Sequence, residues 1–163
     1  MKKDKSAHTT CLCGDTMVPK NHPRIVFRGR LDTLQAEFIE AQVLAWENGD
    51  DELVGCLGEV LEYLRSMMAA EVMEKSLLPP ALFEMDPEEL HQRSHNAGDK
   101  NFAFPCHEQG PLAVRLNTLR ARVREVELAA IDAFDQRDDI ILGLNRLSSA
   151  LWWLYSEYVA KSG

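Results

Sequence analysis

The sequence lacks long apolar runs, extended alternation of apolar and polar residues, and an excess of basic residues. No apolar run reaches the ~18–20 residues that a membrane-spanning helix needs, and no apolar segment follows the charged residues 1–5, which argues against a signal peptide. Scarce β-branched runs and missing period-two alternation exclude a large β-sheet. At 163 residues, 45% of them hydrophobic, the chain suits one cytoplasmic domain without membrane contact.

The charge is acidic overall but unevenly distributed. The formal net charge of −8 argues against nucleic acid as a partner, because general nucleic-acid binders carry a basic patch. Residues 1–30 nevertheless hold seven Lys and Arg residues against two acids. A basic segment on an acidic body suits a small polyanion such as a triphosphate. Residues 2–5 alone would also fit a solvated, disordered tail.

Helical periodicity, interrupted by glycine and proline, predicts an all-α bundle of about five helices. The first helix should open near Pro23 and end at Glu47, and Asp86 followed by Pro87 predicts the start of a short helix that carries His91 and His95. The remaining predicted helices cover residues 51–75, 111–136 and 138–160. The apolar stripe predicted for the first helix consists of Val26, Leu31, Leu34, Phe38, Ile39, Val43 and Trp46.

Between the short helix and the fourth helix, residues 96–111 show no periodicity. An irregular stretch of this length inside a compact domain is usually functional. It contains the aromatic residues Phe102 and Phe104, followed by Pro105.

Three charged residues of the fourth predicted helix share one face. Arg120, Arg124 and Glu127 stand at i, i+4 and i+7, beside the apolar stripe. Two guanidinium groups one turn apart can grip a phosphate chain, because Arg donates bidentate hydrogen bonds and keeps its charge. The same spacing also fits a solvated helix face with local Arg–Glu pairs.

Three segments resemble the motifs of corrinoid (cobalamin) adenosyltransferases, in the family's order. Residues 119–127 resemble the pattern Ala-Arg-x-x-x-Arg-Arg-x-Glu, with Glu125 in place of the second Arg of the pair. Residues 144–148 are similar to Leu-Asn-Arg-Leu-Ser-Asp, with Ser149 in place of the Asp. Lys20, Arg24 and Asp32 resemble the Lys-x-x-x-Arg…Asp segment of the first long helix. The segment of residues 90–95, together with Glu125 and Ser149 at the two departures, is similar to the ethanolamine-utilisation branch of the family.

The resemblance implies an enzyme that transfers the 5′-deoxyadenosyl group of ATP to the cobalt of reduced cob(I)alamin, giving adenosylcobalamin and triphosphate. Members of the family are homotrimeric bundles with ATP between neighbouring subunits, and Mg²⁺ accompanies the ATP. Asp32 would pair with Arg120 across the subunit boundary to order a site that includes Arg124. The nucleotide-binding residues that the resemblance implies are Lys20, Arg24, Arg28, Arg124, Glu127, Asn145, Gly14 and Asp15.

Two further assignments follow from the resemblance. Gly14 and Asp15 would correspond to the Gly-Asp of the family's nucleotide loop, so we divide the chain into a flexible arm, 1–19, that holds this loop-like segment and a helical domain, 20–163. Phe102, in a Phe-x-x-Pro stretch before the Arg-rich helix, would wedge against the lower face of the corrin and displace its axial base. Phe104 is the substitute if the register of the loop differs by two residues.

The four cysteines, Cys11, Cys13, Cys56 and Cys106, fit free thiols or metal ligands in a reducing cytosol. His8, Cys11 and Cys13 offer three ligands within six residues for a divalent transition metal, and inert thiols are the alternative. Longer ethanolamine-type enzymes carry a His and a Cys-Cys-x-x-Cys cluster, which this chain lacks. His91 and His95, spaced i and i+4, could chelate a metal or pack locally.

Alternative functions also fit the sequence. A corrinoid- or nucleotide-binding protein with little catalytic activity would suit the departures at Glu125 and Ser149. A helical metal-binding protein would need His8, Cys11, Cys13, Cys106 and His107 to converge in space. For the enzyme, a cobalamin-dependent lyase or a reductase is a candidate delivery partner.

Overall fold

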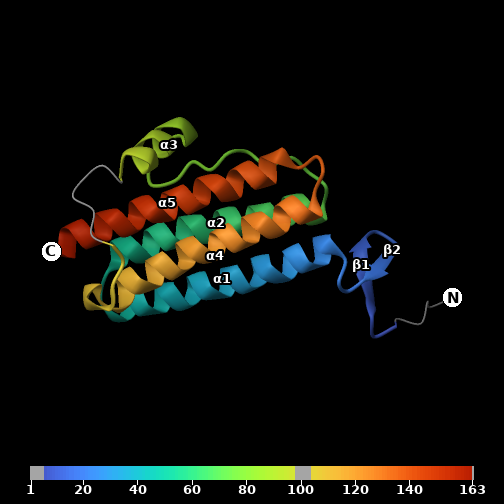
Figure 1. Ribbon diagram of the computed structural model, residues 1–163, viewed down its shortest axis with the longest axis horizontal. Coiled ribbons are helices and arrows are strands. Elements are labelled where there is room, and N and C mark those ends of the chain that lie inside the picture. Colours follow the sequence, from blue (N-terminus) through green and yellow to red (C-terminus); the bar gives the residue numbers. More distant parts are fainter. Residues whose placement is uncertain (1–5, 98–103, 163) are drawn as a thin grey trace.

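Four long helices form a bundle, with a short helix packed outside it and a β-hairpin at one end (Figure 1). The computed structural model describes residues 6–97 and 104–162. Within these residues no helix is both long and apolar enough to cross a membrane. The elements are β1 (Thr9–Cys13), β2 (Thr16–Pro19), α1 (Pro23–Glu47), α2 (Asp51–Val72), α3 (Pro87–Asn96), the 3-10 helix η2 (His107–Gln109), α4 (Pro111–Ala133) and α5 (Asp138–Ser162).

The predicted all-α bundle is confirmed, and the helices begin at the predicted residues. Asp50 caps α2 through the amide of Leu53, and Asp86 caps α3 through the amide of Glu89. Three helix ends differ from the prediction. α2 stops at Val72, three residues early, α4 stops at Ala133 rather than at residue 136, and α5 runs to Ser162 rather than to residue 160.

The N-terminal segment contains a regular element that the sequence analysis did not predict. β1 and β2 pair as an antiparallel hairpin, with a bulge between Cys11 and Cys13 and a turn at Gly14, whose φ of 53° favours glycine. A two-stranded hairpin is marginal alone. Here Arg28 of α1 donates a hydrogen bond of 2.7 Å to the carbonyl oxygen of Leu12, which ties the hairpin to the bundle.

The core of α1 differs in part from the predicted stripe. Leu31, Leu34 and Phe38 are buried as expected, together with Phe27, Ala41 and Ala45. The prediction is wrong for four positions of the stripe. The face of α1 that packs against the neighbouring helices includes the small residues Ala41 and Ala45, and the four larger apolar residues lie on the solvent side. The four exposed residues are Val26, Ile39, Val43 and Trp46, the last with 68% of its surface exposed.

The segment after α2 runs back along the bundle to α3 (Figure 1), and residues near the start of α5 fix its beginning. Arg137 donates a hydrogen bond of 2.7 Å to the carbonyl oxygen of Lys75, and Asp139 accepts one of 2.8 Å from the amide of Leu77. Burial opposes ionisation of Asp139, but hydrogen bonds from Arg137, Leu77 and Ile140 outweigh it. The pKa of this carboxyl therefore lies below its usual value.

We expect Asp139→Asn to lower the free energy of unfolding by about 1 kcal/mol near neutral pH, because it weakens these hydrogen bonds. A depressed carboxyl pKa contributes stability above the unfolded pKa of about 4, and that contribution is lost as the pH falls through the folded pKa. The difference in the free energy of unfolding between wild type and variant should therefore shrink below about pH 4. Urea unfolding over pH checks this, with exposed Asp138→Asn as the control. A difference that stays constant would contradict it.

Candidate active site

Four of the predicted site residues line one pocket between α4 and α5, roofed by the end of α3. Arg120, Arg124 and Glu127 come from α4, and Asn145 comes from α5. Helical spacing explains the convergence, since residues three, four and seven apart share a face. The pocket has a volume of about 420 Å³ and is lined by Ser94, His95, Arg120, Arg124, Glu127, Leu128, Asn145, Ser148, Ser149 and Trp152. We call it the α4–α5 pocket.

Arg120 is held in a fixed orientation at this pocket. Its Nε donates a hydrogen bond of 3.1 Å to Oδ1 of Asn117, and its guanidinium lies 5.6 Å from the ring centroid of Trp152. A cation over an aromatic face is stabilised by the ring quadrupole. Arg120 is therefore a positioned cation with restricted freedom.

Arg124 differs from the other arginines of α4 in its contacts. Arg122 forms ion pairs with Glu37 and Glu125, and Arg115 forms one with Glu40. Among the described residues, no hydrogen bond or ion pair engages the exposed Arg124. Its guanidinium is thus available to an anionic ligand. Glu125, where the family pattern has Arg, serves as the ion-pair partner of Arg122.

The acidic and amide groups of the pocket lie together. Asn145 Nδ2 donates a hydrogen bond of 3.4 Å to Oε1 of Glu127. Ser149, which stands where the family pattern has Asp, also lines the pocket. No local sequence pattern predicts Ser94, His95 or Trp152 at this pocket, because the packing of α3 against α5 brings together segments that are distant in the sequence. The ring centroids of His91 and His95 lie 6.4 Å apart on successive turns of α3, which fits local packing, and chelation of a metal by this pair stays a prediction.

A smaller hollow of about 250 Å³ adjoins the α4–α5 pocket, because Leu128 lines both. Val26 and Leu128 contribute exposed apolar surface to it, with 38% and 61% of their area accessible. The hollow is lined by Asn21, Pro23, Val26, Arg30, Leu128, Ala129 and Asp132. It extends the outer face of α4 toward the start of α1.

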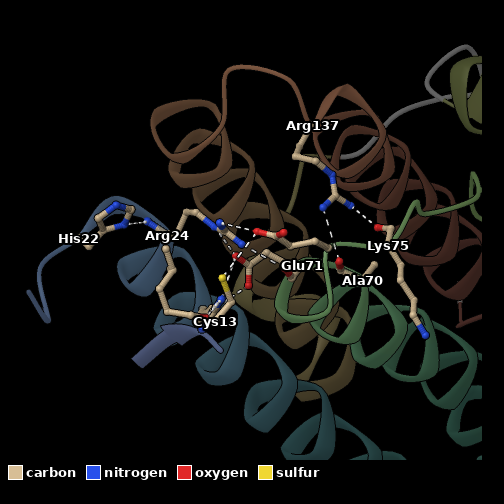
Figure 2. A network of polar contacts seen from close by, with 10 residues as sticks. Cys13, His22, Arg24, Ala70, Glu71, Lys75 and Arg137 are labelled. Carbon is tan, nitrogen blue, oxygen red and sulfur yellow. Dashed lines mark hydrogen bonds and ion pairs between the residues drawn. The ribbon is translucent and has the colours of Figure 1, made fainter. Parts of the chain in front are cut away.

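Arg24 and Arg28, both predicted to bind nucleotide, meet at the hairpin end of the bundle. Figure 2 shows Arg24 and Glu71 within this network. Both form ion pairs with the buried carboxylate of Glu71, and Arg24 also pairs with Glu74 at 3.4 Å. We call these four residues the Glu71 cluster. Burial works to lower the pKa of the Arg24 guanidinium, but hydrogen bonds and charges from Glu71 and Glu74 outweigh it, so the pKa is raised. Arg24 stays a cation.

The remaining predicted nucleotide residues lie on exposed positions away from the α4–α5 pocket, and so does Asp32, which was predicted to pair with Arg120. Gly14 and Asp15 form the turn of the hairpin, Lys20 follows β2, and Asp32 is exposed on α1. None of them lines the α4–α5 pocket as the described residues define it. One chain thus presents two groups of predicted residues, and their juxtaposition stays a prediction.

The predicted metal ligands occupy the hairpin. Cys11 donates a hydrogen bond to the carbonyl oxygen of Gly14, and Cys13 lies 3.8 Å from Oε1 of Glu74. Across residues 6–97 and 104–162, no group of three or more His, Cys, Asp or Glu side chains is placed to hold a metal ion, and this range includes His8. All four cysteines are free thiols. Burial raises the pKa of the Cys56 thiol to about 11, so it stays protonated at neutral pH.

Phe102 lies outside the described residues. Phe104 is exposed, and its carbonyl oxygen accepts a hydrogen bond of 3.3 Å from Gln109. Gln109 is itself fixed to the bundle, since it accepts a hydrogen bond of 2.7 Å from the hydroxyl of Tyr155 in α5. The described end of this loop is therefore anchored beside the start of α4.

The sequence model of the cobalamin adenosyltransferase family matches residues 1–158. This chain belongs to that family. It is 31% identical over 169 residues to the corrinoid adenosyltransferase EutT of Salmonella typhimurium, covering 98% of this chain and 61% of that relative. It is 32% identical over 152 residues to EutT of Escherichia coli, covering 88% of this chain and 55% of the relative. The chain thus spans little more than half the length of these relatives.

The fold is also that of a solved family member. A variant of a PduO-type ATP:corrinoid adenosyltransferase from Lactobacillus reuteri, solved in complex with cobalamin and ATP, superposes with a TM-score of 0.69 at 18% identity. The match covers 94% of this chain and 91% of that one. The helical arrangement that the motifs implied is therefore the fold of the family.

Proposed function

We propose that this protein transfers the 5′-deoxyadenosyl group of ATP to the cobalt of cob(I)alamin and releases triphosphate. The observation that carries the proposal is the convergence of Arg120, Arg124, Glu127 and Asn145 in one pocket of a chain that belongs to the cobalamin adenosyltransferase family. The relatives named as corrinoid adenosyltransferases support it. Residues 1–19 would supply the nucleotide-loop segment and residues 20–163 the helical scaffold, in a cytoplasmic protein.

The chemistry suits the residue types that are present. Cobalt(I) supplies the electron pair that attacks C5′ of ATP, so a cobalt–carbon bond forms and the bond from C5′ to the triphosphate oxygen breaks. No side-chain base is required. The leaving triphosphate needs fixed positive charge, which Arg124, Arg24 and Lys20 would supply together with the Mg²⁺ that accompanies ATP.

We infer that the site is completed between subunits of a homotrimer. Within one chain, Arg120 faces Trp152 of α5 while Asp32 is exposed on α1. A second copy would allow the two to pair and would bring Lys20 and Arg24 toward Arg124. The exposed apolar surface at Val26 and Leu128, which line the hollow beside the α4–α5 pocket, suits burial against such a copy. A corrinoid-using lyase or a reductase remains a proposed delivery partner.

We further propose that Phe102, or Phe104 in the shifted register, displaces the axial ligand of cob(II)alamin. We expect Phe102→Ala to retain adenosylation of pre-reduced cob(I)alamin but to lose activity from cob(II)alamin with a biological reductant, because cob(II)alamin that keeps its lower axial ligand is hard to reduce. Electronic spectra of the ATP complex check this through the signature of four-coordinate cob(II)alamin. A signature undiminished in both Phe102→Ala and Phe104→Ala would contradict the assignment.

The direct test of the proposed function is an anaerobic assay with ATP and chemically reduced cob(I)alamin, followed by absorbance. We expect adenosylcobalamin to form well above the rate without protein. Tight binding of ATP and corrinoid without product would instead favour the alternative of a binding protein with little catalytic activity.

A further inference from the structure

Glu71 is the one charged residue that is fully buried among the described parts of the chain, with 0% of its surface exposed. It lies in the last turns of α2, and neither a motif nor a helical pattern in the sequence marks it. Burying a carboxylate costs several kcal/mol unless it is paired and fully hydrogen-bonded. Replacing a whole buried ion cluster of this kind by hydrophobic residues of similar size is often neutral or stabilising. The ionised side chain therefore calls for a reason other than stability.

The carboxylate of Glu71 is shared by two guanidinium groups (Figure 2). Arg24 Nε donates to Oε1 at 2.7 Å, while Arg28 donates from Nε to Oε2 and from Nη2 to Oε1. Arg24 Nη2 also donates to the backbone carbonyl oxygen of Glu71 at 3.2 Å. Both arginine side chains are thereby fixed on the hairpin side of the bundle, with 17% and 16% of their surface still exposed.

The same cluster holds the hairpin in place. Arg28 Nη2, which contacts Glu71, donates a hydrogen bond of 2.7 Å to the carbonyl oxygen of Leu12. Leu12 is two residues from Gly14, the turn residue of the hairpin. Cys13 lies 3.8 Å from Glu74, the exposed partner of Arg24. The position of the turn thus depends on Arg28, and the orientation of Arg28 depends on Glu71.

The balance of charge leaves this cluster able to accept an anion. One buried carboxylate faces two guanidinium groups, so Arg24, Arg28 and Glu71 together carry a formal charge of +1. Glu74 brings the formal charge of the four-residue cluster to zero, but water screens its carboxylate, because the side chain is 60% exposed and its contact with Arg24 is 3.4 Å long. Fixed cations with an exposed edge meet a phosphate chain without first losing side-chain freedom.

We propose that Glu71 is a positioning residue for the triphosphate of ATP. It holds Arg24 and Arg28 on the hairpin side of the bundle, each with part of its surface exposed, and, through Arg28 and Leu12, it sets the hairpin turn at Gly14 and Asp15. Loss of its charge releases both arginines and loosens the hairpin together. This inference rests on the proposed adenosyltransferase function and adds to it a residue that does not itself touch the substrate.

The test compares Glu71→Gln with Glu62→Gln, an exposed glutamate of the same helix whose ion pair with Arg65 lies at the surface. We expect Glu71→Gln to raise the KM for ATP by about tenfold or more, with the KM for cob(I)alamin changed less than about twofold. Hydrogen exchange should be faster for the amides of residues 9–19 than in wild type. Glu62→Gln should match wild type in all three measurements.

A second variant keeps the test decisive if Glu71→Gln does not fold. Glu71→Asp retains the charge but shortens the side chain, so it should fold, raise the KM for ATP and leave the KM for cob(I)alamin unchanged. A folded variant with wild-type KM for ATP, or one in which both KM values rise equally, would overturn the positioning role. If wild-type protein makes no adenosylcobalamin, the proposed function itself fails, whereas hydrogen exchange still reports whether Glu71 holds the hairpin.

Discussion

Replacing Arg124 with Ala is expected to weaken ATP binding by roughly tenfold to over a hundredfold, or about 1.5–3 kcal/mol. The expectation rests on the free guanidinium of Arg124 at the α4–α5 pocket, which no described residue engages. A charge-assisted hydrogen bond to phosphate contributes about this much to binding. The guanidinium of Arg124 is charged at any pH at which ATP binds, so the wild-type protein makes this contact throughout. Calorimetry with the Mg²⁺ complex of ATP measures the effect.

Arg122→Ala is the matched control for this prediction. It removes the same side chain from the same helix, but Arg122 is already paired with Glu37 and Glu125 on another face. Its dissociation constant for ATP should stay within about twofold of wild type, because surface pairs contribute about 0–1 kcal/mol. Equal dissociation constants for wild type and Arg124→Ala would show that the arginine stripe is only a solvated helix face.

Reversing the charge of Asp32 is expected to break the trimer and the activity together. If Asp32 pairs with Arg120 of a neighbouring subunit, Asp32→Arg places two cations in contact. Close charge pairs at interfaces contribute about 1.5 kcal/mol or more, so activity should fall at least about tenfold. Sedimentation at micromolar concentration should show smaller species. The exchanged pair, Asp32→Arg with Arg120→Asp, should recover part of the assembly.

Glu47→Arg provides the comparison for charge reversal on the same helix. Glu47 is exposed at the last position of α1, and its reversal should leave sedimentation unchanged. A monomeric wild-type protein across micromolar concentrations would contradict the trimer. Failure of the exchanged pair to recover any assembly would contradict the Asp32–Arg120 contact.

Much of the fold was predictable, because its signals are local. Pro23 in a first turn, and Asp86 before Pro87, mark helix starts through backbone chemistry that operates within a few residues. The convergence of Arg120, Arg124 and Glu127 was predictable for the same reason, since helical spacing alone sets a shared face. Asn145 was predicted to belong to the same site only through the resemblance of residues 144–148 to the family motif.

Other features depend on contacts between segments that are distant in the sequence. The hairpin needs Arg28 to hold Leu12, 16 positions away, and no stretch of its own sequence signals that contact. The sequence does not distinguish Glu71 from the other acidic residues of α2. Only the packing of α1 against α2 places Arg24 and Arg28 next to its carboxylate. Helical spacing of apolar residues predicts Trp46 on the core stripe of α1, whereas the packing of the bundle leaves 68% of its surface exposed.

The most direct measurement of the central claim is a reaction in which ATP is limiting and cob(I)alamin is in excess, under anaerobic conditions, with adenosylcobalamin and the phosphate products determined in the same sample. Displacement at C5′ predicts equimolar adenosylcobalamin and intact triphosphate, and both should fall together in Arg124→Ala. Release of ADP and phosphate without adenosylcobalamin, or recovery of unchanged ATP, would contradict the account.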